Sequence, residues 1–196
     1  MTLVSRVKGI LMTPKAEWAI IDNEPTSVGS LYTSYIIPLA AIGPICLFIG
    51  MSLVGYNMLG VSVKWPVDLG LETAIVSYAL SLVSVYVLAL IINALAPNFG
   101  GQKDAIQALK VAAYASTAAW VAGVFMLLPA LGILRILGLY SFYLMFLGLP
   151  PLMKAPEEKA AGYVIVVVVC AIVLYFIVAA ITSRVFVYPG MNPYQP

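Results

Sequence analysis

Long runs of apolar residues make up most of the chain, and short segments rich in glycine, proline and charge separate them. A hydrocarbon core about 30 Å thick requires about 20 apolar residues in a helix. Five runs reach this length: residues 31–54, 71–95, 106–128, 130–149 and 161–182. The last run contains "YVIVVVVCAIVLYFIVAAI", whose β-branched residues favour a strand in water. We predict a helix there, because a lone strand leaves its backbone groups unsatisfied in lipid.

The connections between these runs carry signals that end one helix and begin the next. Pro97 predicts a stop, and the following pair of glycines predicts a turn. Asp104 then predicts an N-cap, with Gln107 three residues later as in a capping box. Pro129 and Gly132 predict a tight hairpin between the third and fourth runs. The pattern as a whole predicts an all-α, polytopic transmembrane bundle of five helices spanning residues 31–182.

Residues 1–30 precede the bundle and contain "LMTPKAEWAIID". Thr13 is a typical N-cap, and Pro14 is a typical first helical residue. Trp18 and the two isoleucines after it supply an apolar face, so we predict a short amphipathic helix lying in the membrane interface. Trp18 would be its anchor at headgroup level. Such a helix either anchors the first span alone or also contacts partners, and the anchor is the simpler interpretation.

Composition places the chain in the membrane class. It is 63% hydrophobic and 9% charged, whereas soluble domains carry about a quarter charged residues. The net charge of +2 and the lack of a basic patch argue against a nucleic-acid partner. Histidine is absent, and the two cysteines are far apart within apolar runs. We therefore expect no metal, no cofactor and no histidine-based catalysis.

The distribution of positive charge predicts the orientation. With five spans, the N-terminal segment and the second and fourth loops share one side of the membrane. Seven of the ten Lys and Arg residues lie on that side, and two lie on the other. The seven are Arg6, Lys8, Lys15, Lys103, Lys110, Lys154 and Lys159. We therefore expect a cytoplasmic N-terminus and an extracytoplasmic tail over residues 183–196.

Several segments resemble the Yip domain family of five-span membrane proteins (Ypt/Rab-interacting proteins), and its bacterial branch in particular. They are "ILMTPKAEWAII", "LYTSYIIPLAAIGPICLFIG" and the stretch from "FGGQKDAIQALKVAAYAS" to "LGLPPLMKAPEEKA". The resemblance covers nearly the whole chain and implies a five-span fold in a bacterial inner membrane. Eukaryotic relatives carry an Asp-Leu-Tyr-Gly-Pro signature where this chain has Ser30-Leu31-Tyr32-Thr33-Ser34. The contact with Rab-type GTPases that the eukaryotic branch implies is therefore not carried over.

Charged residues inside spans are functional candidates, because burying them in lipid is costly. Arg135 lies about six residues into the fourth run, and Glu72 begins the second run from the same side, with Asp68 one turn earlier. We predict that Arg135 pairs with Glu72 or Asp68. The alternative is that Arg135 extends to the headgroups.

Small and hydroxylated residues repeat at helical spacing in two spans. Ser77 and Ser81 belong to a polar face of the second span, and Ala115, Ala119 and Gly123 form a small-xxx-small pattern in the third. Such faces usually allow close helix packing, and they make self-association plausible. A polar face can instead line a path for a solute. Pro38, Gly43 and Pro44 also predict a break or a kink in the first span.

No constellation of catalytic residues is visible in the sequence. Without histidine, a serine nucleophile needs a lysine base, and no lysine lies beside a serine within a span. The prediction is a non-enzymatic membrane protein that organises or recruits membrane partners or influences lipid organisation. The alternative is a transporter of a small solute or lipid, with a pathway between the first, second and fourth spans.

Overall fold

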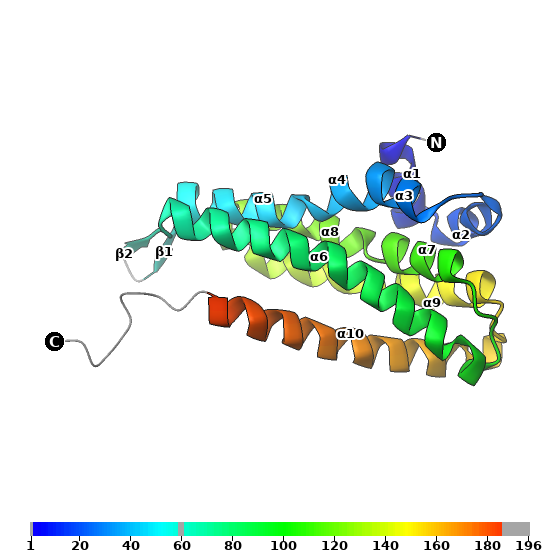
Figure 1. The fold of residues 1–196 in the computed structure, drawn as a ribbon. Coiled ribbons are helices and arrows are strands. Elements are labelled where there is room, and N and C mark those ends of the chain that lie inside the picture. The colour runs from blue at the N-terminus through cyan, green and yellow to red at the C-terminus, as the bar shows by residue number, and fades with distance from the viewer. Residues whose placement is uncertain (1, 59–60, 186–196) are drawn as a thin grey trace.

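The computed structural model describes residues 2–58 and 61–185, so most of the predicted tail lies outside the described residues. Five helices of this part of the chain are long and apolar enough to cross a membrane. They span Val28–Val54, Val67–Phe99, Ala105–Leu127, Pro129–Met153 and Glu157–Ala180. The predicted five-helix bundle is therefore confirmed. Helices α1 (Leu3–Met12) and α2 (Pro14–Asn23) lie at one end of the elongated bundle, and the last turn of α10 (Glu157–Val185) points to the other (Figure 1).

The first span is interrupted, as its prolines and glycine predict. Its segments are α3 (Val28–Leu31), the π-helix η1 (Tyr32–Ile36), α4 (Ile37–Ala40), α5 (Ile42–Phe48) and the π-helix η2 (Ile49–Val54). Pro38 cannot donate a backbone hydrogen bond, which loosens the helix around it. The Tyr78 hydroxyl donates to the Ile37 carbonyl oxygen at 3.1 Å. A side chain of the neighbouring span thus hydrogen-bonds to the backbone of the first span where that span is interrupted.

The second span is long and continuous. A short antiparallel hairpin of β1 (Tyr56–Met58) and β2 (Val61–Val63) connects the first span to it, with Tyr56 opposite Val63. This hairpin is a small addition to the predicted all-α fold. Helix α6 (Val67–Leu95) follows and ends in the 3₁₀ turn η3 (Ala96–Phe99). Gly100 then has a φ of 74°, the left-handed conformation that glycine tolerates best, which confirms the predicted turn.

The third and fourth spans form the predicted tight hairpin, but much of it is 3₁₀ rather than α-helix. The third span consists of α7 (Ala105–Ala115), α8 (Thr117–Ala122) and the 3₁₀ segment η4 (Gly123–Leu127). The fourth consists of the 3₁₀ segment η5 (Pro129–Leu139) and α9 (Tyr140–Met153). A run of 11 residues is unusual, since 3₁₀ runs longer than about four residues are uncommon.

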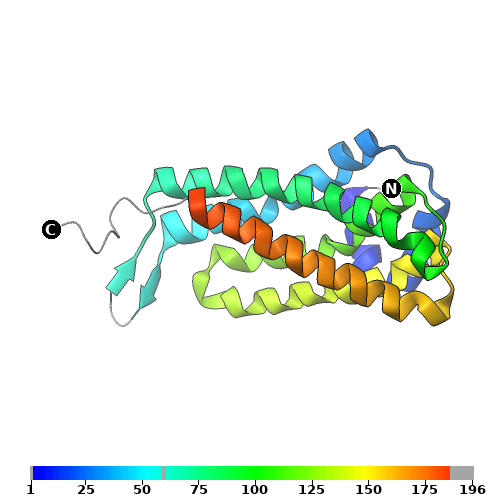
Figure 2. The ribbon, with the colours of Figure 1, turned by 60° about the horizontal axis from the view of Figure 1, so that its bottom comes forward.

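Packing between the helices is uneven along the bundle. Helix α7 lies at its centre, with all eight residues from Ala108 to Ala115 buried, and it packs on α6 and α9. Helix α10 runs along the bundle beside α6 and packs on α6, α9 and η3 (Figure 2). Segment η5 instead packs on α8, η4 and α9. Helix α10 and η5 therefore use different neighbours in the half of the bundle near the β-hairpin.

Candidate functional sites

The α1–α2 pair forms a compact cap on the bundle, which differs from the predicted interfacial helix. Helix α2 begins at Pro14 as predicted, but it packs against α9. Trp18 is 1% exposed, and its ring meets Tyr114 edge-on at 6.2 Å. The prediction of Trp18 as a headgroup-level anchor is therefore wrong, because the indole fills a space in the protein core. Ile20, predicted on the same face, is exposed.

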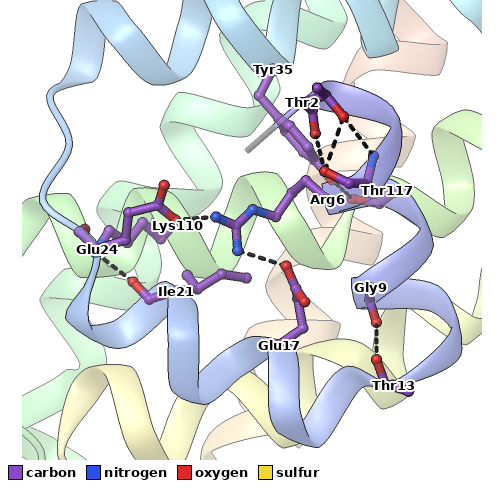
Figure 3. Close-up of polar contacts among 11 residues, drawn as sticks. Thr2, Arg6, Gly9, Thr13, Glu17, Ile21, Glu24, Tyr35, Lys110 and Thr117 are labelled. Atoms are coloured by element: carbon purple, nitrogen blue, oxygen red, sulfur yellow. Dashed lines mark hydrogen bonds and ion pairs between the residues drawn. The ribbon is translucent and has the colours of Figure 1, made fainter.

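A buried ion-pair cluster joins the two helices of the cap (Figure 3). The Arg6 guanidinium contacts the Glu17 carboxylate at 2.7 Å and also the Glu24 carboxylate. Arg6 and Glu17 are 4% and 5% exposed, and the Arg6 guanidinium carbon lies 5.6 Å from the centre of the Tyr114 ring. A buried charge is tolerated only when it is paired, so Arg6 and Glu17 require each other in this position.

Lys110 attaches the end of α2 to the third span. Its ammonium group donates to the backbone oxygens of Ile21 at 2.8 Å and Glu24 at 2.7 Å, and it lies 3.5 Å from that of Asp22. A cation at a helix C-terminus satisfies carbonyls that have no partner within the helix. The Lys110 side chain therefore turns inward to α2 rather than outward to the lipid headgroups.

Two further side chains hold the same end of α2. Asp104 caps α7 as predicted, accepting from the backbone of Ile106 and Gln107 at 2.9 Å. The Gln107 Nε2 group donates to the Asp22 backbone and carboxylate oxygens at 3.0 and 3.1 Å. Its Oε1 atom accepts no hydrogen bond from the described residues, so the capping box is not completed. Lys154 pairs with the Asp22 carboxylate at 2.7 Å. Side chains from α7 and from the end of α9 thus converge on one short helix end.

A polar cavity of about 190 Å³ lies between the cap and the first and third spans. Arg6, Glu24, Lys110 and Tyr35 line it, and the Tyr35 hydroxyl hydrogen-bonds the Thr117 hydroxyl at 2.7 Å. The charges on its walls already have partners within the protein, so the cavity offers little unsatisfied charge to a ligand. Its chemistry fits a structural connection between the cap and the bundle.

Sequence reasoning counted Arg6 and Lys110 only as positive charges that set orientation, and it gave no role to Glu24. The sequence contained only a weak indication that Arg6 pairs with Glu17 and Glu24. Glu17 and Glu24 are seven residues, or about two helical turns, apart, but nothing in the sequence indicated that α1 folds back on α2. Residues 3–12 were not predicted to be a helix at all.

Arg135 is not paired with either of its predicted partners among the described residues. It is exposed on η5 and lines a groove, and the described residues form no ion pair between it and Glu72 or Asp68, which are also exposed. Segment η5 packs on the third span, whereas the start of α6 packs on the first. The predicted pairing is therefore wrong, because equal depth in the membrane does not make two helices neighbours.

The groove beside Arg135 is formed by two adjoining cavities of about 600 and 360 Å³. They share lining residues from α6, the third span and α10: Leu88, Ser116, Ala119, Ala171 and Tyr175. Arg135 lines the larger cavity, while Ser77 and Ser81 line the smaller one. We call this space the interhelical groove. It lies between the second, third, fourth and fifth spans, not between the first, second and fourth as the transporter alternative predicted.

Two serines on this face of α6 bond to the backbone of their own helix while lining the groove. Ser77 donates to the Thr73 carbonyl oxygen, and Ser84 donates to the Leu80 carbonyl oxygen at 2.7 Å. The remaining walls of the smaller cavity are formed chiefly by apolar side chains such as Val85, Trp120 and Leu174. The polar stripe seen in the sequence thus becomes a largely hydrocarbon surface.

The three small residues of the third span meet different neighbours. Ala115 is fully buried in the core. A side-chain carbon added to Gly138 would lie 3.2 Å from the Ala119 Cα, and one added to Gly123 would lie 2.8 Å from the Gly43 Cα. The pattern therefore allows close contact with both the fourth and the first spans. Self-association through it stays a prediction.

Comparison with known proteins identifies the family. The model of the Yip1 domain matches residues 8–181. The chain belongs to the Yip1 domain family. Inner membrane protein YohC of Escherichia coli strain K12 is 25% identical over 190 residues, which cover 94% of this chain and 97% of that protein. The protein of the same name from Escherichia coli O6:H1 strain CFT073 matches equally. No solved structure matches the chain.

The Yip1 domain match begins at residue 8, within α1, and includes all of α2. The α1–α2 cap is thus largely part of the matched domain. The resemblance seen in the sequence is confirmed, and the chain is an integral membrane protein of the Yip1 family.

Proposed function

We propose that this Yip1 domain protein is a non-enzymatic organiser of the membrane, which holds lipids and membrane proteins around itself. The observation that carries the proposal is the state of the serine face on α6. The hydroxyls of Ser77 and Ser84 bond to their own helix, and the other walls beside them are mostly apolar, so the groove offers mainly hydrocarbon to an occupant. Apolar interhelical spaces of this kind accommodate lipid chains more readily than ions.

The α1–α2 cap supports a role in recruiting partners. Its outer surface exposes Met12, Ile20, Lys8 and Lys15, while the Arg6–Glu17 pair and Lys110 attach its inner surface to the bundle. Exposed apolar side chains beside lysines suit contact with another protein or with an anionic membrane surface. A rigid attachment would present this surface in a fixed position.

We place the protein in the bacterial inner membrane with the cap in the cytoplasm. The name of the Escherichia coli relative, an inner membrane protein, supports the location, and the excess of Lys and Arg at the cap end supports the orientation. Reporters fused to the two chain ends test the orientation. We expect them to report opposite compartments, and reporters that face the same compartment would contradict it.

Proteoliposomes test the function itself. Uptake of a panel of ions, sugars and amino acids should not exceed that of protein-free vesicles. Spin-labelled phospholipids in the same vesicles should show a motionally restricted population when the protein is present. Rapid uptake of any of these solutes would reject the proposal in favour of a transporter.

A further inference from the structure

We propose that the interhelical groove is a binding site for one anionic phospholipid, whose phosphate pairs with Arg135 and whose acyl chain lies along α6, α8 and α10. This inference rests on the proposed organising function and names the ligand of that groove. It follows from the geometry of η5, the charge of Arg135 and the chemistry of the walls.

The 3₁₀ geometry of η5 directs Arg135 toward the groove. Residues three apart in a 3₁₀ helix lie on the same face. Gly138, three residues after Arg135, lies directly against Ala119 of α8. Arg135 therefore shares the face that meets the third span, and it lines the larger cavity together with Ala119 and Ser116.

The depth of Arg135 requires a partner of opposite charge. Six residues separate it from Pro129, where the fourth span begins, and a 3₁₀ helix rises about 2.0 Å per residue, or roughly 12 Å over this distance. A guanidinium at such depth is costly unless it is paired or hydrated. Among the described residues, no acidic side chain lines either cavity of the groove. Within the described part of the chain, Arg135 forms no ion pair.

A phosphate is the anion that suits this position. The planar guanidinium binds phosphate oxygens through two parallel hydrogen bonds. The Ser116 hydroxyl donates to the Ala112 carbonyl oxygen, so Arg135 is the group of this wall that binds the phosphate. A free phosphate ion would leave the apolar walls unfilled, whereas a phospholipid brings hydrocarbon attached to the same group.

The remaining walls accept that hydrocarbon. Side chains of Leu88, Ile136, Leu139, Phe142 and Met145 surround the larger cavity, and Val85, Leu174 and Val178 continue along the smaller one. The two volumes lie within the roughly 300–1,000 Å³ that is typical of ligand pockets.

The rim of the groove faces the bilayer. Tyr175 on α10 and Ile136 on η5 line it and are 64% and 61% exposed. These two exposed side chains belong to different segments that both line the groove, so its opening lies between α10 and η5. A lipid can therefore enter from the membrane without crossing the protein.

Native mass spectrometry of the purified full chain tests the assignment. The probes are phosphatidylglycerol, phosphatidylcholine and diacylglycerol with identical chains, together with inorganic phosphate. We expect one tightly bound phosphatidylglycerol per chain. Arg135→Gln should weaken it about tenfold, the effect of losing a charge-assisted hydrogen bond, while the preference over diacylglycerol disappears. Lys103→Gln, a charge removed from the exposed loop between α6 and α7, should leave the binding unchanged.

A second variant tests the acyl-chain part of the site. Ala171→Phe narrows both cavities and keeps Arg135, so it should weaken phosphatidylglycerol and diacylglycerol together. Thermal unfolding and size-exclusion profiles of each variant establish that it is folded. Equal binding by the wild type and folded Arg135→Gln would overturn the proposal. So would competition by inorganic phosphate at low concentration, or crosslinks from Tyr175→Cys showing that a second copy covers the groove.

Lipid binding at the groove and solute flux in proteoliposomes test two different proposals, the lipid site and the organising function. Loss of the lipid site with no solute flux would leave an organising protein that acts through its cap or another surface. Solute flux in the proteoliposomes would reject the organising function whether or not Arg135 binds lipid.

Discussion

The Trp18 indole lies directly on Gly148, so closely that a side-chain carbon at position 148 would fall 2.6 Å from Trp18 Cζ2. Trp18 belongs to α2 and Gly148 to α9, and this contact seats the cap on the fourth span. The Trp18 ring nitrogen has no hydrogen-bond partner among the described residues, so packing rather than polar bonding holds the indole there. A glycine without a side chain thus determines where the cap rests.

Gly148→Ala should detach or displace the cap. The added methyl group overlaps the fully buried indole, and overpacking of this kind typically costs about 1–3 kcal/mol. Hydrogen exchange of the α2 backbone should become faster while that of α7 stays slow. Gly132→Ala is the matched control, because nothing lies within 4 Å of a side-chain carbon there. Unchanged exchange in α2 would contradict this role of Gly148.

Glu17→Gln should weaken the cap more than Glu24→Gln. The Glu17 carboxylate is buried against Arg6, whereas the Glu24 side chain is 42% exposed. Removing one partner of a buried ion pair costs about 3–5 kcal/mol, and the retained contact with Glu24 should place the loss near the lower value. Protease cleavage between the cap and the bundle measures the difference. Equal sensitivity of the two variants would show that burial of this pair is not the cause.

Lys110→Met should loosen the C-terminal end of α2. Methionine keeps the length and apolar stem but loses the donors to the Ile21 and Glu24 carbonyls, and bonds from charged donors are worth about 1.5–3 kcal/mol. Amide exchange should rise over residues 22–26. Lys103→Met, at an exposed position in the neighbouring loop, serves as the control and should show wild-type exchange.

Gly123→Ala and Gly43→Ala should differ although the two glycines touch. A side-chain carbon at position 123 would lie 2.8 Å from the Gly43 Cα, a backbone atom that cannot rotate away, whereas one at position 43 would meet nothing within 4 Å. We expect Gly123→Ala to lower the thermal unfolding midpoint and Gly43→Ala to leave it nearly unchanged. Similar midpoints for the two variants would mean that the first and third spans separate easily at this crossing.

The sequence alone determined the number of membrane helices, their approximate bounds and the turns between them. Apolar length decides whether a segment can cross a bilayer, and Asp104 and Gly100 act on their own neighbours in the chain. These are local properties, so no knowledge of packing was needed. The family resemblance followed from the same patterns.

Only the tertiary structure decided which polar and aromatic side chains meet. Arg135 and Glu72 lie at similar predicted depth, but η5 and the start of α6 pack against different spans. Trp18 is a residue type that often anchors helices at the membrane interface, but Gly148 leaves room for its ring in the core. Lys110 turns inward because the end of α2 places unpaired carbonyls beside it. Each outcome depends on how separate helices are arranged around the bundle axis, and hydrophobic length is the same for every such arrangement.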